Sequence, residues 1–230
     1  MAKLLAHIAE RRGDVPALID EFGETTWSDF DARVNRLIHA LRSAGLLPGG
    51  TLAVLSGNRR EYYELVAACM HSGWILVPIN WRFAAEEVRY VIENADAQAF
   101  FVDARFAELG VESATGLSAL GSRVLVGGEP PQGFAGYEAM LAGGSAQEPE
   151  DQGLGGVMFY TSGTTGRPKG VRGSMWAQLG GPLAIMELIF KSFTAMLGMP
   201  ENGIALPGLI STLAPAMTSS PTPRRCGARM

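Results

Sequence analysis

Apolar and polar positions follow a helical spacing and then a strand-like run in the first part of the chain. From Ser28 to about Gly45 an apolar residue recurs every three or four positions, which predicts an amphipathic helix with Ser28 as its N-cap. The apolar face of this helix consists of Phe30, Val34, Leu37, Ile38 and Leu41. The run that follows at 52–55, LAVL, is continuously apolar and is typical of a strand that is buried on both sides.

The same alternation of helical spacing and apolar runs continues along the chain. The predicted helices span about 60–71, 84–94 and 174–197, and the predicted strands span 74–79, 99–102, 123–126 and 156–160. Strands that alternate with helices are joined by helical crossovers and therefore run parallel. The expected fold class is α/β, with a parallel-rich sheet and helices on both of its faces.

Two segments interrupt this order. Residues 127–152 are rich in Gly, Pro, Gln and Glu, which indicates a surface connection with a short helix near Tyr137. Residues 204–230 have no helical or strand period and end in a mixture of Ser, Thr, Pro and Arg. We therefore expect residues 1–203 to form the structured part, and residues 204–230 to be an aberrant or disordered tail.

Composition and charge narrow the class of protein. The chain is 47% hydrophobic and 18% charged, which is a globular composition, and its net charge of −4 gives no reason to expect nucleic acid as a partner. Cys69 and Cys226 are too few and too far apart for a disulfide framework, which favours a cytoplasmic location. The longest apolar stretch, at 183–199, is interrupted by Glu187 and Lys191, so we expect no transmembrane segment.

The segment from Tyr160 to Gly170, YTSGTTGRPKG, carries the clearest chemistry. Its glycines permit unusual backbone angles and leave room for peptide N–H groups to turn towards one anion. Four Thr and Ser hydroxyls add donors, and Lys169 adds a compact positive charge. Many donors around one cation are what a polyphosphate requires, so the sequence predicts a nucleotide-phosphate-binding loop.

Two other phosphate-binding patterns do not fit this segment, and a flexible turn without a binding role is the structural alternative. A Walker loop needs Gly directly before the lysine and a hydroxyl directly after it, but Pro168 precedes Lys169 and Gly170 follows it. The dinucleotide pattern GxGxxG is also absent from the sequence. A segment of this composition is often only a flexible turn, but the strand that leads into it favours a binding loop.

The twelve residues YTSGTTGRPKGV closely resemble the signature loop of the adenylate-forming enzymes. That superfamily includes acyl-CoA synthetases, aryl-CoA ligases, luciferases and the adenylation domains of peptide synthetases. The segment 16–20, PALID, is similar to the opening of this superfamily, and the segment 77–82, VPINWR, is similar to a stretch of its acyl-CoA synthetase (fatty-acid–CoA ligase) branch. The resemblance covers about residues 4–203 and implies the N-terminal portion of an AMP-binding (adenylation) domain, which would be an incomplete domain.

The resemblance implies a two-step reaction. A carboxylic or fatty acid would attack ATP to give an acyl-adenylate and pyrophosphate, and the thiol of CoA would then displace AMP. Mg²⁺ would bridge the phosphates of ATP. The loop residues that the resemblance assigns to phosphate binding are Thr161, Ser162, Gly163, Thr164, Thr165, Gly166 and Lys169.

The resemblance also implies features that this sequence lacks. Members of the superfamily are much longer, and their catalytic lysine and adenine-binding motifs would lie beyond residue 230. No catalytic residue is therefore assigned, and we expect a truncated acyl-CoA synthetase that is inactive alone. Two alternatives stay open: a nucleotide-binding or interaction fragment that needs a separate C-terminal half, and a non-functional frameshift product.

The remaining polar residues favour structural roles. His7, His39 and His71 are scattered over predicted helices, so we expect them to be structural or surface residues. Asn80 and Arg82 follow a predicted strand, where α/β sheets place ligands, but a structural role is favoured for both. The charged group at 59–64, with Arg59, Arg60, Glu61 and Glu64, is expected to be the solvated start of a helix.

Overall fold

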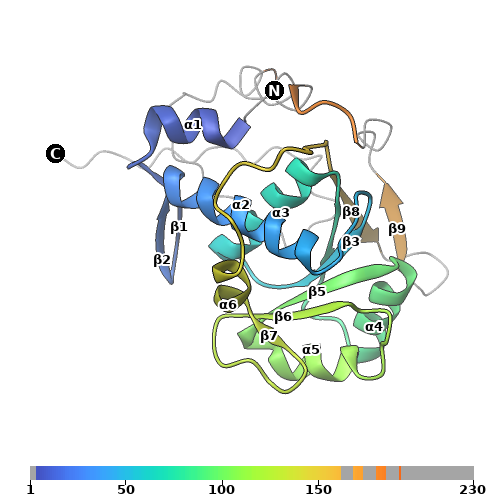
Figure 1. The fold of residues 1–230 in the computed structure, drawn as a ribbon. Helices are drawn as coiled ribbons and strands as arrows, with labels where there is room; N and C mark the ends of the chain where they lie inside the picture. The colour runs from blue at the N-terminus through green and yellow to red at the C-terminus, as the bar shows by residue number, and fades with distance from the viewer. Residues whose placement is uncertain (1–3, 162–167, 173–179, 185–191, 193–230) are drawn as a thin grey trace.

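The computed structural model describes residues 4–161, 168–172, 180–184 and 192, and its main feature is one sheet (Figure 1). The described strands of this seven-stranded sheet follow the order β7-β6-β5-β3-β4-β8-β9. They are β3 (Thr51–Leu55), β4 (Ile75–Ile79), β5 (Ala97–Asp103), β6 (Ser122–Val126), β7 (Ala135–Gly136), β8 (Gly156–Thr161) and β9 (Lys169–Arg172). Every neighbouring pair is parallel except β8 and β9, so the expectation of a parallel-rich sheet is confirmed.

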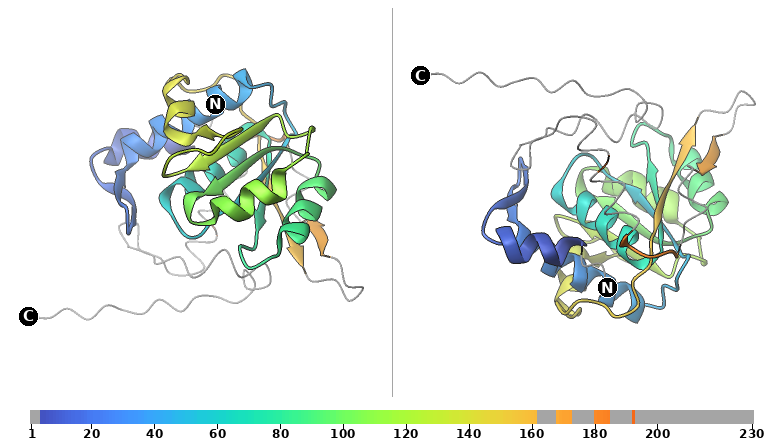
Figure 2. Two further views of the ribbon diagram at one scale, coloured as in Figure 1. Left: turned by 90° about the horizontal axis from the view of Figure 1, so that it is seen from below. Right: turned by 90° about the horizontal axis from the view of Figure 1, so that it is seen from above.

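Helices cover both faces of the sheet, as the alternation of elements predicted (Figure 2). One face is covered by α1 (Leu4–Arg12), α2 (Trp27–Ser43), α3 (Arg60–Ser72) and α6 (Tyr137–Ala142). The other face is covered by α4 (Ala85–Asn94) and α5 (Ala107–Ala114), which follows the short 3-10 helix η1 (Ala104–Phe106). Burial on both faces explains why the strands read as continuous apolar runs.

The side chains of each strand divide between the two cores by simple alternation. In β5, Phe101 points to the α2 and α3 side and Phe100 points to the α4 side, and both are fully buried. Burial of a side chain of this size contributes about 1.5–3 kcal/mol to folding. The two cores therefore share the strands. A shift of β5 by one residue would turn each of its side chains from one core to the other.

The start of α2 differs from the sequence prediction. Thr26, rather than Ser28, is the N-cap, with an extended backbone at φ −72° and ψ 166°. The Thr26 hydroxyl oxygen accepts a hydrogen bond from the Asp29 N–H at 3.1 Å. The helix begins one residue before Ser28 because Thr26 ends a strand and can turn the chain directly into the helix.

That strand belongs to a hairpin that the apolar pattern did not predict. β1 (Pro16–Asp20) and β2 (Gly23–Thr26) pair antiparallel and form a separate two-stranded sheet. Ile19 in β1 is 67% exposed, so the strand has no clean inward and outward alternation. The short helix expected near Tyr137 is confirmed as α6, whereas the helix expected at 174–197 and the tail 204–230 lie outside the described residues. No helix in the described part of the chain is long and apolar enough to span a bilayer.

The segment that connects α6 to β8 is held against α2 by hydrogen bonds. Four α2 side chains donate to its backbone carbonyls: Asn35 to Ala146, Arg36 to Gly144, His39 to Gln147 and Arg42 to Asp151. The bond from His39 Nε2 is 3.0 Å long and fixes that nitrogen as the protonated one, because a carbonyl can only accept. This segment, residues 144–153, thereby sets where β8 begins.

His71 lies beneath the same segment and predicts a pH dependence of stability. Burial lowers the pKa of His71 to about 4, although the charge of Glu148 and the nearby Gln152 side chain act in the opposite direction. The unfolded chain binds a proton near pH 6.5, so it takes up more protons than the folded chain between about pH 6.5 and pH 4. We expect the free energy of unfolding to fall by about 2 kcal/mol between pH 7 and pH 5 because of His71 alone.

Urea denaturation of the unaltered chain and of His71→Gln over this pH range tests the prediction. The His71→Gln variant should lose the extra slope, and its stability should approach that of the unaltered chain as the pH falls. His7→Gln changes an exposed histidine of α1 and should keep the original slope. Parallel curves for the unaltered chain and His71→Gln would contradict the assignment.

Candidate functional site

The predicted phosphate-binding segment forms the end of the β8–β9 hairpin. Thr161, the last residue of β8, pairs with Lys169, the first residue of β9, and Tyr160 pairs with Gly170. The strands therefore take up both ends of the segment that the sequence predicted as a loop. Of the predicted site residues, the structure brings Thr161 and Lys169 together, while Ser162, Gly163, Thr164, Thr165 and Gly166 lie outside the described residues.

The hairpin extends from the carboxyl edge of the parallel sheet. β8 pairs with β4 at two positions, Ile75 with Gly156 and Leu76 with Val157, and from Met158 onward its partner in the described residues is β9. The exposed Lys169 thus lies beyond the ends of the parallel strands. Open α/β sheets bind ligands outside this edge, so the position suits a binding role.

The residues after β4 shape the chain at the same edge. Asn80 Oδ1 accepts a hydrogen bond from the Arg82 N–H at 3.0 Å, and the Arg82 guanidinium lies 4.9 Å from the centre of the Trp81 ring. Trp81 stacks on Phe106 of η1 with 5.5 Å between ring centres. The structural role expected for Asn80 agrees with this turn geometry.

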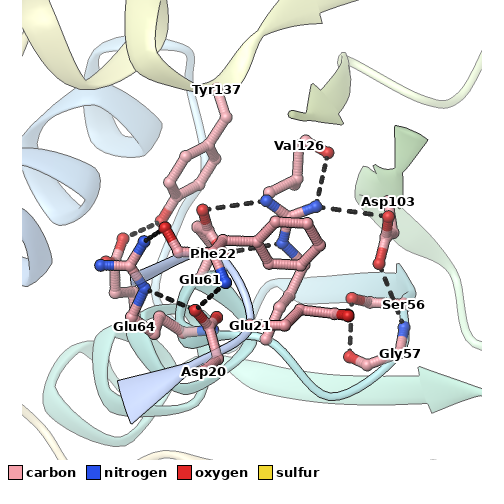
Figure 3. Close-up of polar contacts among 12 residues, drawn as sticks. Asp20, Glu21, Phe22, Ser56, Gly57, Glu61, Glu64, Asp103, Val126 and Tyr137 are labelled. Carbon is pink, nitrogen blue, oxygen red and sulfur yellow. Dashed lines mark hydrogen bonds and ion pairs between the residues drawn. The ribbon is translucent and has the colours of Figure 1, made fainter. Parts of the chain in front are cut away.

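A buried ionic cluster occupies the neighbouring crevice between β3 and β5 (Figure 3). The Arg59 guanidinium donates to Glu61 at 2.7 and 3.0 Å, to Asp103 at 3.3 Å and to the Val126 carbonyl at 3.0 Å. The prediction of a solvated helix start at 59–64 is wrong, because Arg59, Glu61 and Glu64 are buried. This burial could not be predicted from local sequence, because Asp103 and Val126 are distant from Arg59 along the chain.

This crevice is the switch point of the sheet, where the chain leaves β3 towards one face and β5 towards the other. Burial acts to raise the pKa of Asp103, but hydrogen bonds from Arg105 and the charges of Arg59 and Arg105 hold it below its ordinary value. The carboxylate is therefore ionised and fully paired. The protein's own ion pairs occupy this usual ligand position. The β8–β9 hairpin is therefore the better candidate for the ligand-binding site.

A second charged group lines a cavity of about 420 Å³ between α2, α3, α6 and the β1–β2 hairpin. Arg33 donates to Glu64 at 2.7 Å and to both oxygens of Glu138 at 2.9 and 2.7 Å, and Tyr137 donates to Glu64 at 2.7 Å. These hydrogen bonds join α6 to α2 and α3. Among the described residues, no three or more His, Cys, Asp or Glu side chains are arranged to hold a metal ion.

The parallel sheet with two helical layers and the hairpin at its carboxyl edge define an α/β protein with a doubly wound sheet. A family profile described as AMP-binding enzyme matches residues 5–179. The chain belongs to this AMP-binding enzyme family, as its signature segment indicated.

Curated relatives and solved structures agree with this membership. The chain is 33% identical over 165 residues to a fatty acid–[acyl-carrier-protein] ligase of Streptomyces coeruleorubidus, which covers 71% of this chain and 30% of that protein. It is 28% identical over 229 residues to a 3-oxocholest-4-en-26-oate–CoA ligase of Rhodococcus rhodochrous, covering 94% of this chain and 40% of that protein. The chain thus spans well under half the length of these curated relatives.

The similarity in fold likewise covers only part of each solved structure. A crystal structure of an anthranilate–CoA ligase with anthranoyl-AMP matches with a TM-score of 0.65 and 24% identity, over 73% of this chain and 33% of that chain. A protein of Rhodopseudomonas palustris assigned as a long-chain-fatty-acid–CoA ligase matches with a TM-score of 0.70 and 24% identity, over 86% of this chain and 48% of that chain. These similarities establish the fold that the sequence analysis expected.

Proposed function

We propose that this chain supplies the ATP-phosphate-binding part of a ligase that joins a carboxylic acid to the thiol of CoA. The observation that carries the proposal is the pairing of Thr161 with Lys169 at the open end of the β8–β9 hairpin. This pairing brings a hydroxyl donor and an exposed cation together outside the carboxyl edge of the sheet. The curated relatives whose names describe acid–thiol ligases support the choice of reaction.

In this function the hairpin holds the phosphates that leave as pyrophosphate. The ammonium group of Lys169 offsets the negative charge that grows on the leaving group, and the hydroxyl of Thr161 donates a hydrogen bond to a phosphate oxygen. Ser162, Gly163, Thr164, Thr165 and Gly166 contribute further hydroxyl and peptide N–H donors. Mg²⁺ enters with the substrate, bound to the phosphates of ATP.

Activation of the acid needs more than these groups. A carboxylate has no good leaving group, and the adenylate formed with ATP provides one for the attacking thiol. Thr161 and Lys169 are groups that bind phosphate, so we assign phosphate binding to this chain and no acid–base step. We also propose a cytoplasmic location, because the usage of Cys69 and Cys226 fits a reducing compartment.

Removal of the hairpin cation tests the proposal. We expect Lys169→Ala to weaken MgATP binding by about 10- to 100-fold, because a hydrogen bond between charged groups contributes about 1.5–3 kcal/mol. Isothermal titration calorimetry on the full chain measures the change. Arg11→Ala removes the same charge from the exposed face of α1 and should bind MgATP as the unaltered chain does. Equal affinities for all three proteins, or no binding by the unaltered chain, would refute the proposal.

A further inference from the structure

Tyr160 connects the hairpin to the body of the protein. Its hydroxyl donates a hydrogen bond of 2.8 Å to Oδ1 of Asn94, the last residue of α4. Its ring packs against the core on the α4 side of the sheet, where Met158, two residues earlier in β8, is buried. Since β8 has already left β4 at this point, these two side chains hold the hairpin to the α4 side.

Gly170 leaves the space that the Tyr160 ring needs. The two residues are direct partners across the hairpin. A Cβ atom at position 170 would lie 3.2 Å from Cζ of Tyr160 and 3.1 Å from Sδ of Met158, both closer than ordinary contact. The ring therefore covers the glycine of β9, an arrangement that stabilises edge strands that contain glycine.

We propose that Tyr160 is a positioning residue for the phosphate-binding hairpin, held in place by its hydrogen bond to Asn94 and its contact with Gly170. This inference rests on the proposed function. Thr161 follows Tyr160 directly, and Lys169 lies opposite Thr161, so anchoring Tyr160 to α4 restricts the position of the backbone that carries both phosphate-binding groups. A site held in its binding conformation before the ligand arrives loses less entropy on binding, which strengthens affinity.

A double-mutant cycle on MgATP binding tests the role of the hydrogen bond. Tyr160→Phe removes the hydroxyl and keeps the ring, and Asn94→Ala removes the acceptor. We expect each to weaken MgATP binding about fivefold, as a net hydrogen bond of about 1 kcal/mol implies, and the double variant to be no weaker than either. Asn94→Asp keeps an acceptor oxygen and should restore near-original affinity. Tyr63→Phe is the matched control, because the Tyr63 hydroxyl has no hydrogen-bond partner among the described residues.

Limited trypsin digestion measures the anchoring without any nucleotide. Cleavage after Lys169 requires local opening of the hairpin, so Tyr160→Phe and Asn94→Ala should each speed that cleavage about fivefold, and Tyr63→Phe should not. Mass spectrometry identifies the cut. The melting temperature, recorded in parallel, shows whether the whole protein has also lost stability.

The outcomes separate this inference from the proposed function. If the unaltered chain binds MgATP and the Tyr160 and Asn94 variants bind it equally well, the positioning role is overturned and the proposed function stands. A lower melting temperature with unchanged MgATP affinity also overturns it, because it shows a purely structural contact. Failure of the unaltered chain to bind MgATP overturns both.

Discussion

Replacement of Gly155 by alanine should destabilise the protein severely, while the same replacement at Gly156 should have little effect. A Cβ atom at position 155 would lie 1.9 Å from the carbonyl oxygen of Cys69 and 2.5 Å from that of Trp74. Both are backbone atoms, so no side-chain rotation relieves the overlap. At Gly156 the added Cβ meets no atom within 4 Å.

The contacts around Gly155 explain why the backbone cannot simply move away. The Gly155 N–H donates to the Met70 carbonyl at 3.1 Å, and the Gly156 N–H donates to the Trp74 carbonyl at 2.9 Å. These bonds join the start of β8 to the end of α3 and the start of β4. A shift that made room for a methyl group at 155 would break them, leaving buried polar groups unpaired.

We expect Gly155→Ala to lower the free energy of unfolding by about 3 kcal/mol or more, and Gly156→Ala to change it by less than about 1 kcal/mol. Chemical denaturation followed by circular dichroism measures both variants. The contrast matters because β8 carries Thr161 to the hairpin, so MgATP binding should be lost with the stability of Gly155→Ala and kept in Gly156→Ala. Similar losses in both variants would show that the close approach to α3 is not what Gly155 provides.

The central strands could be predicted because a strand that is buried on both faces has apolar residues at consecutive positions. The runs at 52–55 and 99–102 are apolar on both alternations, and the structure buries them between two helical layers. The β1–β2 hairpin was not predictable in this way. Its residues lie outside the main sheet and partly in solvent, so no apolar pattern marks them.

The geometry of the candidate site could not be predicted from the sequence, because it depends on polar contacts between residues that are distant along the chain. The signature segment identified Thr161 and Lys169 from their residue types, but their strand pairing depends on the sheet register. The bond from Tyr160 joins it to a residue 66 positions earlier, and no local pattern connects the two. The same holds for Arg59. Its charged neighbours along the chain suggested that its side chain is exposed to solvent, but its partner Asp103 lies 44 positions away.

Asp103→Ala should be among the most destabilising substitutions of a charged residue in this protein. Its carboxylate is fully buried and accepts hydrogen bonds from Arg59 at 3.3 Å and from the Arg105 side chain at 2.6 Å. It also accepts from the Gly57 N–H at 3.4 Å. Removal would leave the buried Arg59 guanidinium with less negative charge around it, a change that typically costs about 3–5 kcal/mol.

The pH dependence of this contribution follows from the direction of the pKa shift. The pKa of Asp103 is lower in the folded protein than in the unfolded chain, so the ion pairs stabilise the protein fully above the unfolded pKa of about 3.9. The contribution is lost as the pH falls through the folded pKa. The stability difference between the unaltered chain and Asp103→Ala should therefore be constant from pH 7 to pH 5 and shrink only in stronger acid.

Glu21→Gln provides the matched comparison for the Asp103 variant. Glu21 also pairs with Arg105, at 3.2 Å, but its side chain is 63% exposed, and ion pairs in water contribute at most about 1 kcal/mol. Chemical denaturation of both variants at pH 7 should show a several-fold larger loss for Asp103→Ala. Because the two carboxylates share one arginine, such a contrast would attribute the effect to burial at the β3–β5 crevice, and equal losses would assign it to Arg105 alone.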